Sequence, residues 1–194
     1  MSFIGLIFFY ATVLFPNSAC IDSVDYQKKI KETLISFNIK DPITDNVFYE
    51  SCSLVSIGKD IYGREQFLDS QAAESFFEMK KAAKKDSIDL QFVSAFRSFD
   101  SQKKIIERKL NRGSLINKIL EENKLPGYSE HHTGKAIDFT SKKLNTLSTQ
   151  FENSKEFKWI TENASTYNFY LSYPKDNEEG IMYEPWHWMF KNND

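Results

Sequence analysis

Histidine, cysteine and arginine are scarce in this 194-residue sequence, and each shortage narrows the classes of protein that fit. The two cysteines, Cys20 and Cys52, form no CxxC pair, which argues against a cysteine-based metal site and allows at most one disulfide. The formal net charge of −2 shows no excess of either sign, so nothing favours a nucleic-acid partner. Lysine outnumbers arginine, which is limited to Arg64, Arg97, Arg108 and Arg112.

The sequence also has no apolar run that is long enough to span a bilayer. Residues 3–15 are apolar and uncharged, but they fall short of the ~20 residues that span a bilayer. Their length suits the central region of a secretory signal, with small residues following at 16–19, although no lysine or arginine precedes them. We therefore expect residues 1–20 to be a signal peptide or an N-terminal membrane anchor, and the protein to be exported to the periplasm or cell envelope. A buried N-terminal strand or helix is the structural alternative.

Cys20 adds a further alternative at the end of this segment. It follows Ser18-Ala19 as in a lipoprotein cleavage site, although Asn17 stands where such sites usually have leucine. Lipidation of Cys20, with membrane attachment, and a disulfide between Cys20 and Cys52 both stay open. Residues 21–194 are long enough for one compact domain with its own core.

Hydrophobic periodicity predicts alternating helices and strands in that domain. The expected helices cover residues 25–39, a segment that begins at Asp69 or Ser70, residues 101–120 with a break near Gly113, and a segment from about 157 to 167. The expected strands cover 88–96, 135–140, 169–173 and 181–190, with a loop and short strand at 46–57. This order predicts an α+β fold: a single domain with a mostly antiparallel sheet flanked by helices.

The three histidines lie in only two places, both beside acidic residues. His131 and His132 belong to the stretch Ser129–Asp138, and His187 follows Glu184 by three positions. Imidazole and carboxylate together suit zinc, and catalytic zinc sites use three protein ligands and leave one position open. We therefore hypothesise that His131, Asp138 and His187 hold one zinc ion per chain.

The spacing of these residues restricts how the site can form. On one helix His131 and Asp138 would lie two turns apart, whereas a turn at Gly134 followed by a strand brings them to one point. If His131 points inward, His132 points away, as a surface residue or one that supports the ligands. The spacing is also compatible with coincidence, because the H-E-x-x-H helix of common metalloproteases is absent.

Glu184 and Arg97 are the candidates for the remaining chemistry. Three residues separate Glu184 from His187, which in an extended strand would place them on opposite faces unless Pro185 introduces a bulge or turn. Glu184 would then take a proton from water and pass it to the leaving amine. Arg97, at the end of a predicted strand, would stabilise an oxyanion, bind a terminal carboxylate, or form only a structural salt bridge.

Several ordered motifs resemble the VanY-type D-alanyl-D-alanine carboxypeptidase family. Residues 129–138 are similar to its S-x-H-x-x-G-x-A-x-D signature, and residues 184–187 to its E-x-W-H signature. Residues 94–98 with Gln102 resemble a third segment, and the likeness runs from about 70 to 190. Two departures are Met189, where the family often has arginine, and Ala95, where it has glycine.

The resemblance implies a Hedgehog-like, D,D-peptidase-like fold and a zinc carboxypeptidase that acts on peptidoglycan stem peptides. It implies that His131, Asp138 and His187 bind zinc, that Glu184 is the catalytic base, and that Arg97 contacts the substrate or the oxyanion. Substrate contacts are expected from Ser129, Gln102 and Trp186.

Three alternatives to the removal of a terminal D-Ala remain at this stage. An L,D-carboxypeptidase acting on the tetrapeptide and an endopeptidase acting on cross-bridges would use the same site. A non-catalytic, zinc-stabilised module that binds the cell wall is the alternative from another class. Glu184 argues against that module, because a structural zinc site needs no base.

Overall fold

The computed structural model describes residues 22–40, 46–144, 146–177 and 181–192. The predictions for residues 1–20, Cys20 and its pairing with Cys52 lie outside these ranges. The α-helices are α1 (Ser23–Ser36), α2 (Ser70–Lys85), α3 (Phe99–Asn111), α4 (Ile116–Leu120) and α5 (Lys155–Asn163). The strands are β1 (Leu54–Lys59), β2 (Glu65–Asp69), β3 (Gln91–Ser94), β4 (Ala136–Thr140), β5 (Phe169–Leu171) and β6 (His187–Phe190). Three short 3₁₀ helices are η1 (Glu130–Thr133), η2 (Thr149–Asn153) and η3 (Ala164–Tyr167).

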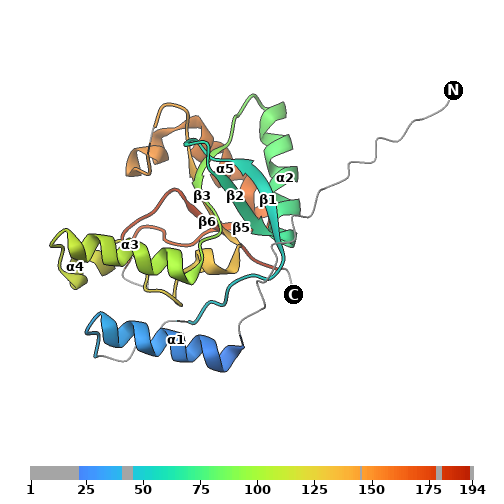
Figure 1. Ribbon diagram of the computed structural model, residues 1–194. Coiled ribbons are helices and arrows are strands. Elements are labelled where there is room, and N and C mark those ends of the chain that lie inside the picture. The colour runs from blue at the N-terminus through green and yellow to red at the C-terminus, as the bar shows by residue number, and fades with distance from the viewer. Residues whose placement is uncertain (1–21, 41–45, 145, 178–180, 193–194) are drawn as a thin grey trace.

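Every strand pair is antiparallel, which confirms the predicted α+β class. Four strands form one sheet in the order β3-β4-β6-β5, and β1 with β2 forms a separate hairpin. The two central strands of the sheet, β4 and β6, are far apart in sequence, and the segment between them contains α5 and β5. Figure 1 shows α2 and α5 beside the strands, and α3 and α4 on the other side, with α1 below them.

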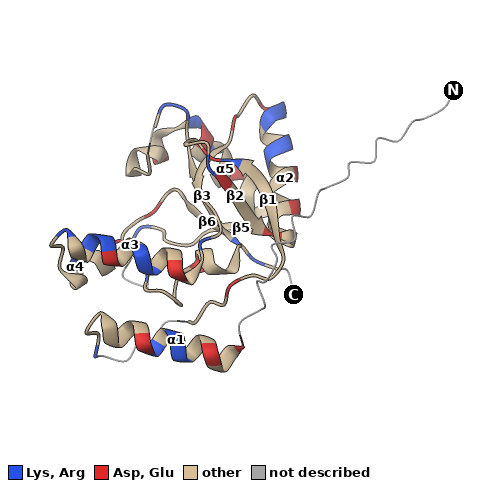
Figure 2. Ribbon diagram, viewed as in Figure 1, with Lys and Arg blue, Asp and Glu red and all other residues tan. Residues whose placement is uncertain are grey.

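Two clusters of buried side chains hold these layers together. The larger cluster joins α2, α5 and the four-stranded sheet, and the smaller one joins α1, α3 and α4 through Tyr26, Ile106 and Ile119. Helix α2 illustrates why the local sequence is helical: Asp69 caps it by accepting from the Gln71 amide, and one face of alanine, phenylalanine and methionine is buried. Its lysines lie on the outward side, seen in blue in Figure 2.

Some predicted strand limits are wrong. Strand β3 ends at Ser94 rather than at 96, because the next residues leave the ladder: the Phe96 amide donates to Phe67 of β2 and the Arg97 amide to His131. Strand β2 was not expected at all. The predicted strand 181–190 exists only as β6, from His187 onward.

The physical reason for the late start of β6 is a turn around Pro185. Proline offers no amide proton to a ladder, and here the His187 amide donates back to the Glu184 carbonyl at 3.1 Å. The indole Nε1 of Trp188 donates to the Pro185 carbonyl at 2.9 Å. Glu184 therefore lies before the strand, so the opposite-faces problem of an extended chain does not arise. Within the described ranges, no helix has both the length and the apolar character needed to cross a bilayer.

Candidate metal and catalytic site

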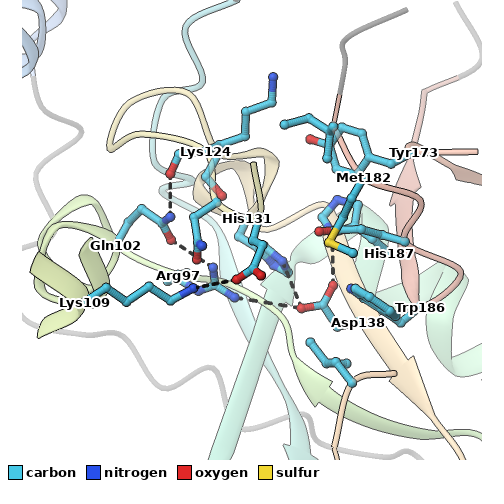
Figure 3. Close-up of a pocket in the computed structure, with 16 residues that line it drawn as sticks. Arg97, Gln102, Lys109, Lys124, His131, Asp138, Tyr173, Met182, Trp186 and His187 are labelled. Atoms are coloured by element: carbon cyan, nitrogen blue, oxygen red, sulfur yellow. Dashed lines mark hydrogen bonds and ion pairs between the residues drawn. The ribbon is translucent and has the colours of Figure 1, made fainter. Parts of the chain in front are cut away.

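The three predicted metal ligands come together where β4 and β6 pair. Asp138 and His187 are direct cross-strand partners in the register of these strands. Nδ1 of His187 lies 2.9 Å from Oδ1 of Asp138, and Nε2 of His131 lies 3.2 Å from Oδ2 (Figure 3). One donor atom from each of the three buried residues lies within 4.8 Å of the others. Two imidazoles and one carboxylate converge in this way at catalytic zinc sites.

Gly134 makes this convergence possible. It follows η1 with φ of +65°, the left-handed conformation that glycine adopts without strain, and it turns the chain from His131 into β4. A Cβ atom at this position would lie only 2.8 Å from the amide nitrogen of Asp69, which donates to the Gly134 carbonyl. Both the backbone angle and the close packing therefore require glycine, as the sequence predicted for the angle.

The outer nitrogens of the two imidazoles also have partners. Nδ1 of His131 donates to the carbonyl of Ala95 at 2.6 Å, which leaves Nε2 facing Asp138. Nε2 of His187 lies 2.8 Å from Oε2 of Glu130, and the Ser172 hydroxyl donates to the same oxygen at 2.6 Å. Both rings are thus held at both ends.

Charge in this cluster is strongly coupled. Burial opposes ionisation of Asp138, but the adjacent His131 and His187 outweigh it and hold the pKa of that carboxyl well below its usual range. Burial likewise disfavours the imidazolium of His187, yet its bonds to Asp138 and Glu130 raise its pKa to about 10. Burial lowers the pKa of His131. Without a metal, His187 is therefore the buried cation that pairs with the Asp138 carboxylate.

The pKa of Glu184 is raised, whereas that of Asp138 is lowered. Burial raises its pKa to about 7; the Asp138 carboxylate adds to the shift, while His187 and Arg97 reduce it. Its carboxylate oxygen lies 3.8 Å from Nδ1 of His187, on the side of the metal ligands. A carboxyl group with a pKa near neutrality both takes up and releases a proton readily.

Arg97 lies three residues beyond the end of β3, with its guanidinium directed towards the ligands (Figure 3). Nη1 donates to Oε1 of Gln102 and Nη2 donates to Oγ of Ser94, each at 2.9 Å, and Nη2 lies 3.9 Å from Asp138. Gln102 also donates to the Lys124 carbonyl at 2.6 Å. The buried Gln102 amide is therefore engaged on both sides, and it holds Arg97 in place.

All of the site residues named from the sequence line one cavity of about 330 Å³. These are Arg97, Gln102, Ser129, His131, Asp138, Glu184, Trp186 and His187. Further lining comes from the α3–α4 region and from Tyr173 and Met182, on the opposite side in Figure 3. The sequence brought out none of these additional lining residues, because they belong to no recognisable spacing.

His132 is correctly placed away from the ligands, but it is not a surface residue. Its ring is completely buried; Nδ1 donates to the Arg97 carbonyl at 2.6 Å and Nε2 accepts from the Gly127 amide at 3.0 Å. Burial lowers the pKa of this imidazole to about 4. Glu130 and Ser172 lie in segments that were considered at the level of sequence, but neither was assigned a role in the site; a carboxylate directly before a predicted ligand histidine was the available signal for Glu130.

Comparison with known proteins relates the chain to one family. The family model for VanY, D-alanyl-D-alanine carboxypeptidase, matches residues 65–193. A D-alanyl-D-alanine carboxypeptidase of Enterococcus faecium is 36% identical over 125 residues, which are 62% of this chain and 36% of that protein. The chain spans between 36% and 56% of the length of the curated relatives it matches.

Solved structures share the fold. The LdcB LD-carboxypeptidase superimposes with a TM-score of 0.67 at 33% identity, covering 73% of this chain and 69% of that chain. The vancomycin-resistance D,D-pentapeptidase VanY, solved in complex with Zn(II), gives a TM-score of 0.55 at 22% identity, covering 77% of this chain and 81% of that chain. The predicted D,D-peptidase-like fold is thereby confirmed.

Proposed function

Because the chain belongs to the VanY family of D-alanyl-D-alanine carboxypeptidases, we propose that it is a zinc-dependent carboxypeptidase that removes the terminal D-Ala of peptidoglycan stem peptides. One observation carries the proposal. Two imidazoles and a carboxylate converge within 4.8 Å in a cavity that also contains Glu184 and Arg97. Ligands, base and cation are the parts that metal-assisted hydrolysis of a peptide requires.

The donor set fits one zinc ion. His131, Asp138 and His187 supply nitrogen and oxygen donors in the ratio found at catalytic zinc sites, and a VanY relative of the same fold carries Zn(II). Zinc bound there would polarise the scissile carbonyl and lower the pKa of a water molecule. The count of one ion per chain is part of the proposal, and metal analysis of the purified protein tests it.

The side chains around the ligands carry the remaining steps. Glu184, with its pKa near 7, accepts the proton of the attacking water and delivers it to the leaving amine. Arg97, already fixed by Gln102 and Ser94, presents positive charge to the oxyanion or to the substrate's terminal carboxylate. Ser129 and Trp186 line the same cavity as candidate substrate contacts.

An L,D-carboxypeptidase that removes D-Ala from the tetrapeptide is the second candidate. It is favoured by the likeness to LdcB, at 33% identity and a TM-score of 0.67. Defined muropeptides separate the two: the purified protein is incubated with pentapeptide or tetrapeptide stems, and the products are identified by mass spectrometry. Release of D-Ala from the pentapeptide alone supports the first function and release from the tetrapeptide alone the second. Cleavage only at internal cross-bridge bonds would identify an endopeptidase and refute both.

A non-catalytic, zinc-stabilised wall-binding module is distinguished by Glu184→Gln. The amide keeps the size of the side chain but accepts no proton, so we expect hydrolysis to fall about 100-fold to 10,000-fold while zinc remains bound. Glu162→Gln, on the exposed side of α5, serves as the matched control and should retain wild-type activity. Turnover by Glu184→Gln at the wild-type rate would refute the assigned base.

A peptidoglycan hydrolase must meet its substrate outside the cytoplasmic membrane. We therefore also propose export through residues 1–20, with cleavage, anchoring or lipidation at Cys20 as the forms that export can take. Mass spectrometry of protein from cell fractions tests this. A mature protein that begins at Met1 and is found only in the cytoplasm would overturn the proposal.

A further inference from the structure

The two histidine ligands are oriented by different kinds of acceptor. A metal-binding imidazole offers the lone pair of one nitrogen, and the partner of the other nitrogen fixes which nitrogen carries the proton. His131 donates Nδ1–H to the neutral backbone carbonyl of Ala95. His187 instead directs Nε2 at a carboxylate, Glu130, which belongs to the same short helix η1 as His131.

Glu130 is itself held in place. Its side chain is only 11% exposed, and Oε2 accepts both from His187 Nε2 at 2.8 Å and from the Ser172 hydroxyl at 2.6 Å. Ser172 lies directly after β5, and its amide donates to the His187 carbonyl at 3.3 Å. Serine, glutamate and histidine thus form a chain that ends at the metal ligand.

The position of Glu130 excludes it as a fourth ligand of the same ion. Nδ1 of His187 faces Asp138, and Glu130 lies at Nε2, on the far side of the ring (Figure 3 shows the Asp138 side). Among the described residues, the three-member donor group that lies within 4.8 Å contains His131, Asp138 and His187 without Glu130. Glu130 therefore acts on the site through the imidazole.

We propose that Glu130 is a positioning residue that accepts Nε2–H of His187 and so directs the Nδ1 lone pair at the metal. The Ser172 hydroxyl, which donates to the same carboxylate oxygen, restrains the Glu130 side chain in this position. A carboxylate acceptor also makes the ring a stronger donor to a metal than a carbonyl acceptor would. The inference rests on the proposed function for the identity of the metal, but not for the hydrogen bond between His187 and Glu130.

Zinc affinity and the His187 tautomer test the proposal together. Affinity is measured by competition with a chromophoric chelator for the wild type, Glu130→Gln, Glu130→Ala and Ser172→Ala. We expect affinity to fall about tenfold in Glu130→Gln and up to about 100-fold in Glu130→Ala, with a smaller loss in Ser172→Ala. Glu162→Gln is the control and should bind zinc like the wild type.

The second measurement uses ¹⁵N-labelled histidine and long-range ¹H–¹⁵N correlation spectra of the wild type. We expect zinc-bound His187 to carry its proton on Nε2 alone, and zinc-bound Glu130→Ala to lose this preference. A zinc-bound wild-type His187 protonated on Nδ1, or a folded Glu130→Ala with unchanged zinc affinity, would overturn the proposal. If Glu130→Ala does not fold, the wild-type tautomer and Glu130→Gln decide. A wild type that binds no zinc contradicts the proposed function instead. The Nε2–H proton of His187 then still tests Glu130, because it should be protected from exchange with solvent in the wild type and exposed to it in Glu130→Ala.

Discussion

Arg97 shows how a single side chain is prepared for a role before any substrate is present. Its two terminal nitrogens donate to Gln102 and Ser94, and its backbone amide and carbonyl bond to His131 and His132 respectively. The planar fork of the guanidinium meets two acceptors at fixed angles, which an ammonium group cannot do. The orientation of Arg97 is therefore part of the fold.

We predict that Arg97→Lys lowers kcat/KM about 100-fold to 1,000-fold, the loss typical of one removed oxyanion donor. The charge is retained, but the ammonium cannot satisfy Gln102 and Ser94 together while facing Asp138. Steady-state kinetics on a defined stem peptide measure the effect, with Arg112→Lys, an exposed position after α3, as the control. If kcat/KM falls by less than tenfold, Arg97 has no role in catalysis beyond a structural ion pair.

At the level of elements, the turn between η1 and β4 is the most sensitive point of the site. Gly134→Ala forces a side chain into a left-handed backbone and against the Asp69 amide at 2.8 Å. We expect the free energy of unfolding to fall by about 2–5 kcal/mol, of which about 1–2 kcal/mol comes from the backbone angle and the rest from the overlap. Chemical denaturation followed by tryptophan fluorescence measures it.

Gly113→Ala is the matched control for that prediction. Gly113 also has a positive φ, +86°, but an added Cβ atom meets nothing within 4 Å. The free energy of unfolding of Gly113→Ala should therefore fall by only about 1–2 kcal/mol, the cost of the backbone angle alone. Equal decreases in the free energy of unfolding at the two glycines would show that the close packing of Gly134 against Asp69, at the end of β2, contributes nothing.

The β1–β2 hairpin supports the site from a distance. At its turn the buried Asp60 carboxylate accepts from the Tyr62 and Arg64 amides, the Arg64 guanidinium and the Gln66 amide. Gln66 in turn accepts from the amide of Ala95, whose carbonyl orients the ligand His131. A hydrogen-bonded path thus connects the hairpin turn to the metal site.

Asp60→Asn should destabilise the protein by about 2–4 kcal/mol, because the NH₂ group of asparagine would face N–H donors that now meet a carboxylate oxygen, and because the ion pair with Arg64 is lost. Thermal and urea unfolding measure the loss. Asp176→Asn is the control, since Asp176 is exposed and asparagine tolerates its left-handed backbone. If Asp60→Asn unfolds like the wild type, the hairpin turn is not anchored by this carboxylate.

The same carboxylate gives the stability a pH dependence. Burial opposes its ionisation, but the hydrogen bonds from Arg64 and Tyr62 outweigh it and lower the pKa of Asp60 in the folded state. A lowered pKa contributes stability that is complete above the unfolded value of about 3.9 and is lost as pH falls through the folded value. As pH falls through this acidic range, the free energy of unfolding of Asp60→Asn should therefore decrease less steeply than that of the wild type.

The elements that sequence reasoning predicted well have strong local signals. Helix α2 has a capping aspartate, an apolar face and terminal lysines, and the break between α3 and α4 coincides with Gly113. Strand β2 was missed because Glu65–Asp69 is mostly polar, and its place depends on pairing with β1. The predicted strand over residues 181–190 begins too early, because the local turn from Glu184 to His187, which contains Pro185, precedes the ladder.

The residues of the site likewise fall into those that local sequence signals identify and those that only the fold reveals. His131, Asp138, His187 and Glu184 could be selected from scarcity and spacing, and the resemblance assigned them roles. Glu130 and Ser172 could not be selected in this way, because their relation to His187 exists only once β5 and β6 are paired. Long-range partners of a ligand leave no periodic trace in the sequence.

For the molecule as a whole, zinc should act as a stabilising ligand. The donors come from η1, β4 and β6, so binding favours the folded state over chains in which these elements are separated. At a free zinc concentration of 100 times Kd we expect about 2.7 kcal/mol of added stability, or roughly 5–10 °C in Tm. Differential scanning fluorimetry with and without chelator measures this; Asp138→Asn should show a much smaller shift, and an equal shift would contradict the assigned ligand set.

The neighbouring positions of β4 and β6 also bear on the order of events in folding. Residues 141–186, which include α5 and β5, separate β4 from its partner β6 along the chain. Contacts that close such long loops form late, because closing the loop costs chain entropy before the new contacts stabilise the fold. Asp138 meets His187 only in that closing step. If Co²⁺ is added during refolding, the absorbance of the bound ion should therefore appear only when β4 and β6 have paired. Chains that are compact but have not yet paired these strands should give no such signal.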